Sequence, residues 1–269
     1  METQINLFKD VFSEPAARMQ AEEKRSTAFG TLASLKVWDR PKEADIALVG
    51  SEKRYEPFWY VRATRRVLYN KKALYVLKAV DGHAQQVTVL GQTLPITASR
   101  PLELSGVEHC EAVTTLSEYY DGLKRKEGDL RFVELVGKHL YDPVTDAGAS
   151  EFVEPELTLG TLLQQVKHTL MKPIEAGEML EDSLEVTQVA LFYRPVYAFE
   201  YAWRDKKATV EVDGLTGKIK RDGSMFGGML KKMANRDVLF DVGAELAGAV
   251  VPGGGVVVKM VGQLSRKDA

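Results

Sequence analysis

Three short patterns in the first half of the chain recur in the second half in the same order. They are Arg40-Pro41-Lys42-Glu43-Ala44, Tyr55-Glu56-Pro57 and Lys71-Lys72-Ala73, which return about 135 residues later as Lys172-Pro173-Ile174-Glu175-Ala176, Tyr193-Arg194-Pro195 and Lys206-Lys207-Ala208. Repetition constrains the fold more than any other feature, because both copies have to adopt a similar structure. The order is kept and only the spacing changes, which predicts a duplicated unit with connecting loops of different length. Such a duplication suits a scaffold, or a site built between the copies.

The residue pattern of each copy predicts a helix with an antiparallel sheet, and therefore an α+β fold. In the first copy, residues 55–77 are rich in strand formers and predict a hairpin that turns at Asn70-Lys71-Lys72. In the second copy, alternation predicts strands at 184–192, 196–203 and 208–212, with a last turn at 213–217. The helix before them is predicted from apolar residues at helical spacing, namely Leu159, Leu162, Leu163, Val166 and Leu170.

The remaining segments carry fewer signals. Residues 13–35 predict a helix, with Ser13 as its cap and Pro15 in its first turn. Residues 86–96 predict a tight hairpin that turns at Gly91-Gln92. Between residues 97 and 156 only one helix is predicted, at 129–140, and the rest is expected to be irregular.

These elements divide the chain into four segments. An N-terminal helical segment covers residues 1–36, the first α+β unit 37–142, the second 156–222 and a C-terminal segment 225–269. In the last segment, residues 238–264 are almost wholly apolar and are divided by Pro252-Gly253-Gly254-Gly255. Each part is shorter than the roughly 20 residues of a membrane-spanning helix. We therefore expect a Gly-rich apolar helical hairpin, which has to be covered by protein or lipid.

The end of the second unit resembles a known family. The turn Val212-Asp213-Gly214-Leu215-Thr216-Gly217, together with the hairpin at 201–219 and the helix before it, is similar to PepSY-like modules. In that family a helix precedes strands whose last pair is closed by a Val-Asp-x-x-Thr-Gly turn. The resemblance, which spans about 160–219, implies a non-catalytic binding or inhibitory module. The first copy has Val80-Asp81-Gly82-His83 at the corresponding turn and lacks the Thr-Gly.

Composition excludes some classes of function. The chain has 269 residues, 45% of them hydrophobic, which is enough for a buried core without disulfides. Its 36 basic and 38 acidic residues nearly cancel, so no overall field favours nucleic acid. Cys110 is the one cysteine and residues 1–18 lack the apolar region of a secretory signal, which predicts a cytoplasmic protein.

Residues able to carry chemistry are present but poorly spaced for it. His109 and Cys110 are adjacent, and adjacent side chains point in different directions on either a strand or a helix. The other histidines, His83, His139 and His168, have no metal-ligand spacing, and no metal or cofactor is predicted. Lys259 is separated from the glycines at 253–255 by three valines, so the segment does not match a phosphate-binding Walker loop.

Two charged clusters have alternative interpretations. Arg62, Arg65 and Arg66 lie beside the aromatic residues at 58–60, which suits single-stranded nucleic acid or a strand that buries one face and exposes the other. We favour the strand because net charge is close to zero. The acidic residues Glu175, Glu178, Glu181, Asp182 and Glu185 are expected to form a solvated face rather than an acid/base pair.

The sequence as a whole favours a non-catalytic cytoplasmic binding or scaffold protein. It is expected to self-associate, or to dock on a partner protein, through the C-terminal hairpin. The predicted contact residues are Leu239, Val242, Leu246, Val250, Val257 and Val261. Two alternatives stay open: a peripheral membrane protein that uses the same hairpin, and an enzyme with a site between the two repeats.

Overall fold

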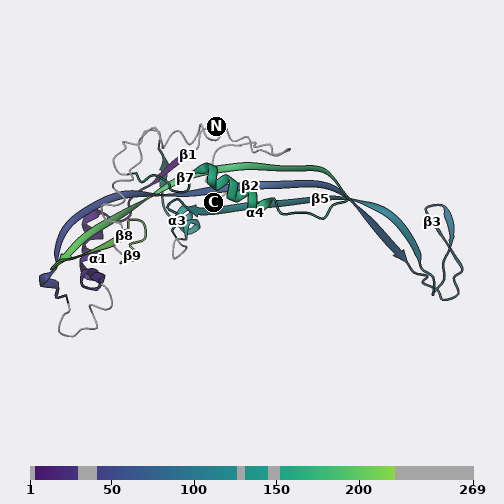
Figure 1. Ribbon diagram of the computed structural model, residues 1–269, viewed down its shortest axis with the longest axis horizontal. Coiled ribbons are helices and arrows are strands. Elements are labelled where there is room, and N and C mark those ends of the chain that lie inside the picture. The colour runs from purple at the N-terminus through teal and green to yellow at the C-terminus, as the bar shows by residue number, and fades with distance from the viewer. Residues whose placement is uncertain (1–3, 30–40, 126–130, 145–151, 222–269) are drawn as a thin grey trace.

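A computed structural model describes residues 4–29, 41–125, 131–144 and 152–221. In these ranges the fold is α+β and consists mostly of sheet, which confirms the predicted class. The molecule is elongated, and three long strands run along most of its length (Figure 1).

The three long strands are antiparallel neighbours in the order β5-β2-β7. β2 (Ala47–Leu77) is central and pairs with β5 (Leu102–Asp121) on one side and β7 (Glu178–Trp203) on the other. Strands in globular proteins usually have five or six residues, so these are unusually long.

The charges of the three strands explain the order β5-β2-β7. β2 contains seven Lys or Arg and two Glu, whereas β5 contains five acidic residues and no Lys or Arg, and β7 five acidic residues and one Arg. Opposite charges across neighbouring strands are favourable, and like charges are not.

Shorter strands extend the sheet along the far edge of β7. β1 (Gln4–Phe8) lies parallel to β7 and also pairs with β6 (Tyr141–Pro143). β8 (Lys206–Asp213) pairs with the end of β7 and with β9 (Ile219–Lys220). A separate hairpin of β3 (Gln86–Val89) and β4 (Gln92–Pro95) lies at the opposite end of the molecule from β8 and β9 (Figure 1).

Two helices cover one face of the sheet. α4 (Leu159–Leu170) buries its apolar stripe in the same core cluster as Trp59 and Leu191, and α1 (Glu14–Lys24) buries Ala17 and Ala21 against the β7–β8 pair. Thr158 caps α4 by accepting the Thr161 N–H.

A third helix covers the opposite face. α3 (Phe132–Lys138) stacks Phe132 on Phe58, with ring centroids 4.3 Å apart. Two short 3-10 helices, η1 (Arg25–Phe29) after α1 and η2 (Glu43–Asp45) before β2, complete the described elements.

Several predicted elements are confirmed. α4 has the bounds given by its apolar stripe. The β3–β4 hairpin is present, but it turns at Leu90 and Gly91, which have φ values of 53° and 75°, one residue before the predicted Gly91-Gln92. The helix predicted at 13–35 ends at Lys24 and continues as η1, and its last part lies outside the described residues. The helix predicted at 129–140 is shorter and corresponds to α3.

Other predictions were wrong where a strand depends on a distant partner. No turn occurs at Asn70-Lys71-Lys72, because β2 continues to Leu77 and Asn70 contacts Glu178 and His109 on its two neighbours. Residues 102–121 are one strand rather than an irregular segment. The strands predicted at 184–192 and 196–203 are one strand, β7, which also contains most of the acidic run at 175–185.

The packing of α4 gives a first prediction. Leu162 is fully buried, so Leu162→Ala should lower the free energy of unfolding by about 3 kcal/mol through lost burial and a cavity. Gln164→Ala is the control, because it changes an exposed position on the same helix. Urea denaturation followed by circular dichroism measures both, and equal effects would contradict the assigned helix face.

Candidate functional site

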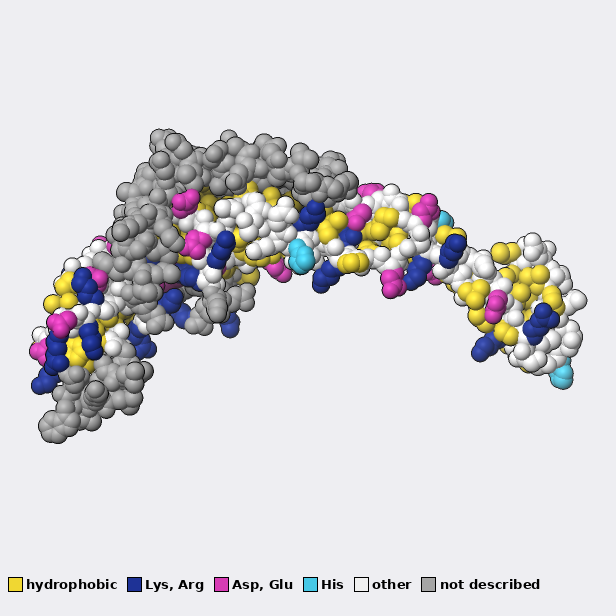
Figure 2. Space-filling view, viewed as in Figure 1, with side chains coloured by type: hydrophobic (Ala, Val, Ile, Leu, Met, Phe, Trp, Pro, Cys, Tyr) yellow, Lys and Arg dark blue, Asp and Glu magenta, His cyan; other side chains and the backbone are white. Residues whose placement is uncertain are grey.

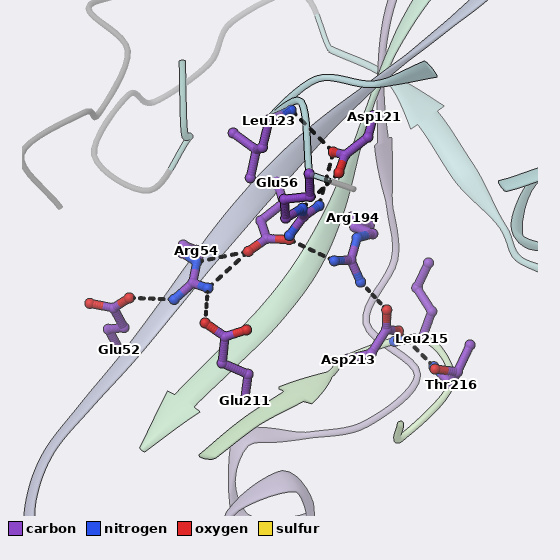
Figure 3. A network of polar contacts seen from close by, with 11 residues as sticks. Glu52, Arg54, Glu56, Asp121, Leu123, Arg194, Glu211, Asp213, Leu215 and Thr216 are labelled. Atoms are coloured by element: carbon purple, nitrogen blue, oxygen red, sulfur yellow. Dashed lines mark hydrogen bonds and ion pairs between the residues drawn. The ribbon is translucent and has the colours of Figure 1, made fainter. Parts of the chain in front are cut away.

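A buried network of charged side chains lies in the part of the sheet where β7 pairs with β2, which we call the body (Figure 3). Its centre is Glu56, which is fully buried and paired in the sheet with Arg194. The flanking residues match as well, since Tyr55 pairs with Pro195 and Pro57 with Tyr193. The two copies of this repeated pattern therefore face each other across the β2–β7 ladder.

Three guanidinium groups surround the Glu56 carboxylate. Arg54 donates to Glu56 Oε1 from Nε and Nη2, at 3.1 and 2.8 Å. Arg125 and Arg194 each donate to Oε2 at 2.6 Å. Such charge-assisted bonds are stronger than neutral ones, and a carboxylate buried this deeply requires them.

Each arginine also contacts at least one outer carboxylate. The outer partners are Glu52 and Glu211 for Arg54 (both 2.6 Å), Asp121 for Arg125 (2.7 Å) and Asp213 for Arg194. Asp121 and Asp213 in addition accept backbone N–H groups of their own turns, from Leu123 and from Leu215 and Thr216. These N–H groups help to stabilise the excess of carboxylates over guanidiniums in the network.

The network holds its members in their charged forms. Burial alone would raise the pKa of Glu56, but Arg194, Arg125 and Arg54 outweigh burial and keep that pKa far below its usual range. Burial would likewise lower the pKa values of Arg54 and Arg125, and the neighbouring carboxylates raise them instead. A site with such shifts keeps its protons fixed, whereas a general acid or base needs a pKa near the working pH.

The two Asp-Gly-Leu turns of the network make matching contacts with the two prolines. Gly122 N–H donates to Pro57 O at 3.1 Å, and Gly214 N–H donates to Pro195 O at 2.9 Å. A Cβ at Gly122 would lie 2.7 Å from Pro57 O, and one at Gly214 would lie 2.9 Å from Pro195 Cγ, so both positions require glycine.

The segments before α1 and α4 repeat this correspondence. Leu157 N–H donates to Gly122 O, and Phe12 N–H donates to Gly214 O. Trp59 Nε1 then donates to Leu157 O at 2.7 Å, as Tyr197 OH does to Phe12 O at 3.1 Å. Trp59 and Tyr197 each stand two residues after the proline of their pattern.

One difference between the two sides explains Arg125. Arg194 binds Asp213 directly. Glu56, at the matching position, would repel Asp121, and Arg125 lies between these two carboxylates and binds both. The arrangement joins four strands, β2, β5, β7 and β8, through one set of ion pairs.

A second candidate site is the end of the β2–β5 pair, where β7 no longer accompanies β2. We call residues 71–77 of β2 and 102–108 of β5 the arm, and residues 78–101 beyond it, which include the β3–β4 hairpin, the tip. Apolar side chains are visible on the surface of both (Figure 2). The most exposed are Leu74 (56%), Tyr75 (48%), Val76 (49%), Val107 (53%), Val80 (104%) and Leu90 (96%). Exposed apolar clusters of this kind are typical of interaction surfaces.

The residues singled out in the sequence have different outcomes. Leu239, Val242, Leu246, Val250, Val257 and Val261 lie outside the described residues. His109 contacts Asn70 and is exposed, while Cys110 is half-buried on the other face of β5. In the part of the chain that the structure describes, no group of three His, Cys, Asp or Glu residues could hold a metal ion.

Two of the three arginines expected beside aromatic residues, Arg65 and Arg66, bind acidic residues of the neighbouring strands, and the third, Arg62, is exposed. Arg65 binds Asp182 and also donates to the Leu170 and Lys172 carbonyls at the end of α4. Arg66 contacts Glu111 and Glu181, and the neighbouring Phe58 and Trp59 are fully buried. Acidic side chains thus lie against both arginines, as the strand interpretation expects.

No known protein family, curated protein or solved structure matches the chain. The site therefore has to be interpreted from its own geometry.

One element of the network was not predicted from the sequence. The turn at Asp213-Gly214 was expected to correspond to Asp81-Gly82, which lies between β2 and β3. The residues that make the matching contacts are Asp121-Gly122-Leu123. The identical tripeptide Asp-Gly-Leu in both places was the available signal.

The buried charge of Glu56 gives a second prediction. Glu56→Gln leaves three arginines around a neutral amide and should lower the free energy of unfolding by about 3 kcal/mol or more. The same change at Glu134, which pairs with Arg131 and Lys138 on the surface, is the control and should have little effect. Denaturant titration at neutral pH measures both, and similar stabilities for the two variants would refute the network's role.

The lowered pKa of Glu56 gives a third prediction. An ordinary Glu titrates at about 4.3 in an unfolded chain, so the stability that ionised Glu56 contributes is complete above that pH and is lost as pH falls towards the folded pKa. The wild-type protein should therefore lose stability between about pH 5 and pH 2 more steeply than Glu56→Gln. Urea denaturation across this range tests the difference, which parallel curves would contradict.

Proposed function

We propose that this protein is a non-catalytic binding or scaffold protein that acts by self-association or by docking on a partner. The observation that carries the proposal is the arm, which projects from the body and exposes apolar side chains on both of its faces. Residues with even numbers in β2, such as Leu74 and Val76, lie on one face, and Tyr75 and Leu77 lie on the other. A monomer that functions alone has no physical reason to expose such a strip.

We further propose that the body is made of two related units, residues 37–142 and 156–222. The support is the set of matching contacts around Pro57 and Pro195, together with the sheet order β5-β2-β7-β8, which is symmetric about the β2–β7 pair. Each unit contains a strand pair that ends in an Asp-Gly-Leu turn, in keeping with the resemblance to PepSY-like modules. A pseudo-twofold axis would pass between Glu56 and Arg194.

The network supports a structural rather than a catalytic role for the body. All three guanidiniums contact two or more carboxylates, and the pKa values of Glu56, Arg54 and Arg125 are shifted away from neutrality. Rigid support is what a projecting binding element requires, because a preorganised surface loses less entropy on association. The proposal includes a cytoplasmic location and a function that needs no cofactor.

We also propose that the C-terminal segment contributes to association. Its proposed contact residues are Leu239, Val242, Leu246, Val250, Val257 and Val261. Among the described helices, none has the length and apolar character needed to cross a membrane.

The proposal gives a fourth prediction about solution mass. The full chain should exceed its monomer mass of 29.9 kDa in light scattering coupled to size exclusion. A version that ends at Asp237 should form a smaller assembly, because it lacks the apolar segment. Monomers at every concentration for the full chain would contradict self-association, and identical assembly of both versions would remove the C-terminal segment from it.

A further inference from the structure

The sheet face that carries α3 is also buried at a place where no described helix covers it. α3 lies over Phe58, on one side of the Glu56–Arg194 pair. On the other side of that pair, Arg54 and Val196 belong to the same face and are only 1% and 2% exposed. The buried residues of α1 pack on the opposite face, and those of α3 stay in the cluster of Phe58. Another part of this chain therefore has to cover Arg54.

A second buried place on this side of the network has too few neighbours. Leu123 and Val153 are 4% and 0% exposed, and their core cluster has no other member among the described residues. A fully buried side chain usually touches about six to twelve other residues. More apolar side chains are therefore required over these two.

The counterparts of these two residues are covered by α3. Leu123 and Leu215 each directly follow an Asp-Gly turn of the network. Val153 and Phe8 each directly follow a residue that pairs in parallel with the tyrosine of a repeated pattern. Leu215 and Phe8 share one cluster with the three buried residues of α3. A second helix like α3 would cover Leu123 and Val153 in the same way.

The inward-facing residues of α3 recur in the sequence after β9. The set in α3 is Phe132, Leu135, Val136 and Lys138, and the later set, with identical spacing, is Phe226, Met229, Leu230 and Lys232. The first set begins 11 residues after Asp121, and the second begins 13 residues after Asp213. The two segments differ most at Val133, which is 67% exposed in α3, so the difference does not affect the buried side.

We propose that residues 226–232 are the counterpart of α3 and pack on the sheet face over Arg54 and Val196, where they also cover Leu123 and Val153. The inference rests on the two-unit organisation proposed above and is independent of self-association. It gives the start of the C-terminal segment a place in the core of its own chain and leaves the apolar residues 238–264 for association.

The position of Phe226 follows from the pairing in the sheet. Phe58 and Phe192 form the pair two residues from the central ion pair of the network, and Val196 and Arg54 form the pair at the same distance on the other side. α3 stacks its own phenylalanine on Phe58, with ring centroids 4.3 Å apart. In the other half, Phe226 lies over Val196 and the guanidinium of Arg54, and an aromatic ring on a guanidinium plane is a favourable contact.

The connection is long enough for this position. β9 ends at Lys220, which pairs with Glu211, and Glu211 binds Arg54. β8 and β7 separate β9 from β2, and neighbouring strands are about 4.8 Å apart, so the chain has to cross about 14 Å. The five residues between Lys220 and Phe226 reach up to about 17 Å.

The rest of the C-terminal segment fits the surface less well. Its other phenylalanine, Phe240, is followed by Gly243 and Ala244 at the two positions where α3 has larger apolar residues. Those positions would leave Leu123 and Val153 without contacts of the size that α3 supplies.

Thiol labelling of the folded full chain tests the orientation of the segment. In a Cys110→Ser background, Met229→Cys places a thiol towards the sheet, and Lys231→Cys places one away from it. Position 231 corresponds to Gly137 of α3, which is exposed. Maleimide should react with Met229→Cys at least about tenfold more slowly, because the reaction requires the segment to open. Equal rates would overturn the proposal.

A double-mutant cycle tests the location of the contact. Phe226→Ala should raise the unfolding equilibrium constant about a hundredfold in urea denaturation. In combination with Val196→Ala the effect should be smaller, because both changes empty the same contact, whereas with Leu162→Ala on the opposite face it should remain complete. Full additivity with Val196→Ala would refute the contact. Coupling of Val196→Ala to Phe240→Ala instead would place the apolar segment on this surface and refute it as well.

Solution mass separates this inference from self-association. A monomeric wild-type chain in which the Met229→Cys thiol is protected would reject self-association and support the inference. An assembled chain in which that thiol reacts as fast as that of Lys231→Cys would do the reverse.

Discussion

The ion pair between Glu56 and Arg194 determines which strands form the centre of this sheet. The Tyr-Glu-Pro and Tyr-Arg-Pro patterns meet in antiparallel register, so their middle residues lie opposite each other in a buried environment. If β2 met a second β2 here, two glutamates would face each other without solvent, and two β7 strands would bring two arginines together. Removing the partner of a buried charge costs about 3–5 kcal/mol, and adding a like charge costs more. The inversion of charge between the two patterns therefore favours the β2–β7 pair over either self-pair.

The rest of the sheet extends this choice with weaker contacts of the same kind. Away from the centre, Arg65 and Arg66 of β2 bind Asp182, Glu181 and Glu111 on the flanking strands. Surface pairs such as those of Arg66 contribute little to stability, but a strand that is basic along its length cannot easily exchange places with its acidic neighbours. Arg65 has an additional role because it also binds the carbonyls that end α4. That helix is thereby fixed at the point where the covered part of the sheet ends.

The sequence predicted the elements whose signal is local and missed those that depend on a partner. The apolar stripe of α4 and the β3–β4 hairpin need only a few neighbouring residues. The helix was predicted with its observed bounds, and the hairpin was predicted with its turn one residue late, at Gly91-Gln92 instead of Leu90-Gly91. β5 has exposed or half-buried residues at most positions, so alternation alone did not reveal a strand of 20 residues. Its pairing with the basic β2 supplies what its own pattern lacks.

The network was equally hard to foresee. Tyr55-Glu56-Pro57 and Tyr193-Arg194-Pro195 were recognised as related, but sequence similarity does not show that two patterns meet in space. Arg125 had no signal at all, because it is needed only where Glu56 and Asp121 come close together.

Burial changes along the molecule in a way that connects the network to the arm. Near Glu56 both faces of β2 are covered, and Phe58 and Trp59 on its two faces are fully buried, whereas beyond Asn70 one flanking strand and both covering layers are gone. Local stability follows burial and contact density, so the arm is the part of β2 most easily reshaped by a partner and the body the least. β2 is therefore held on both sides near Glu56, whereas in the arm its edge towards β7 and the outer edge of β5 are both unpaired among the described residues.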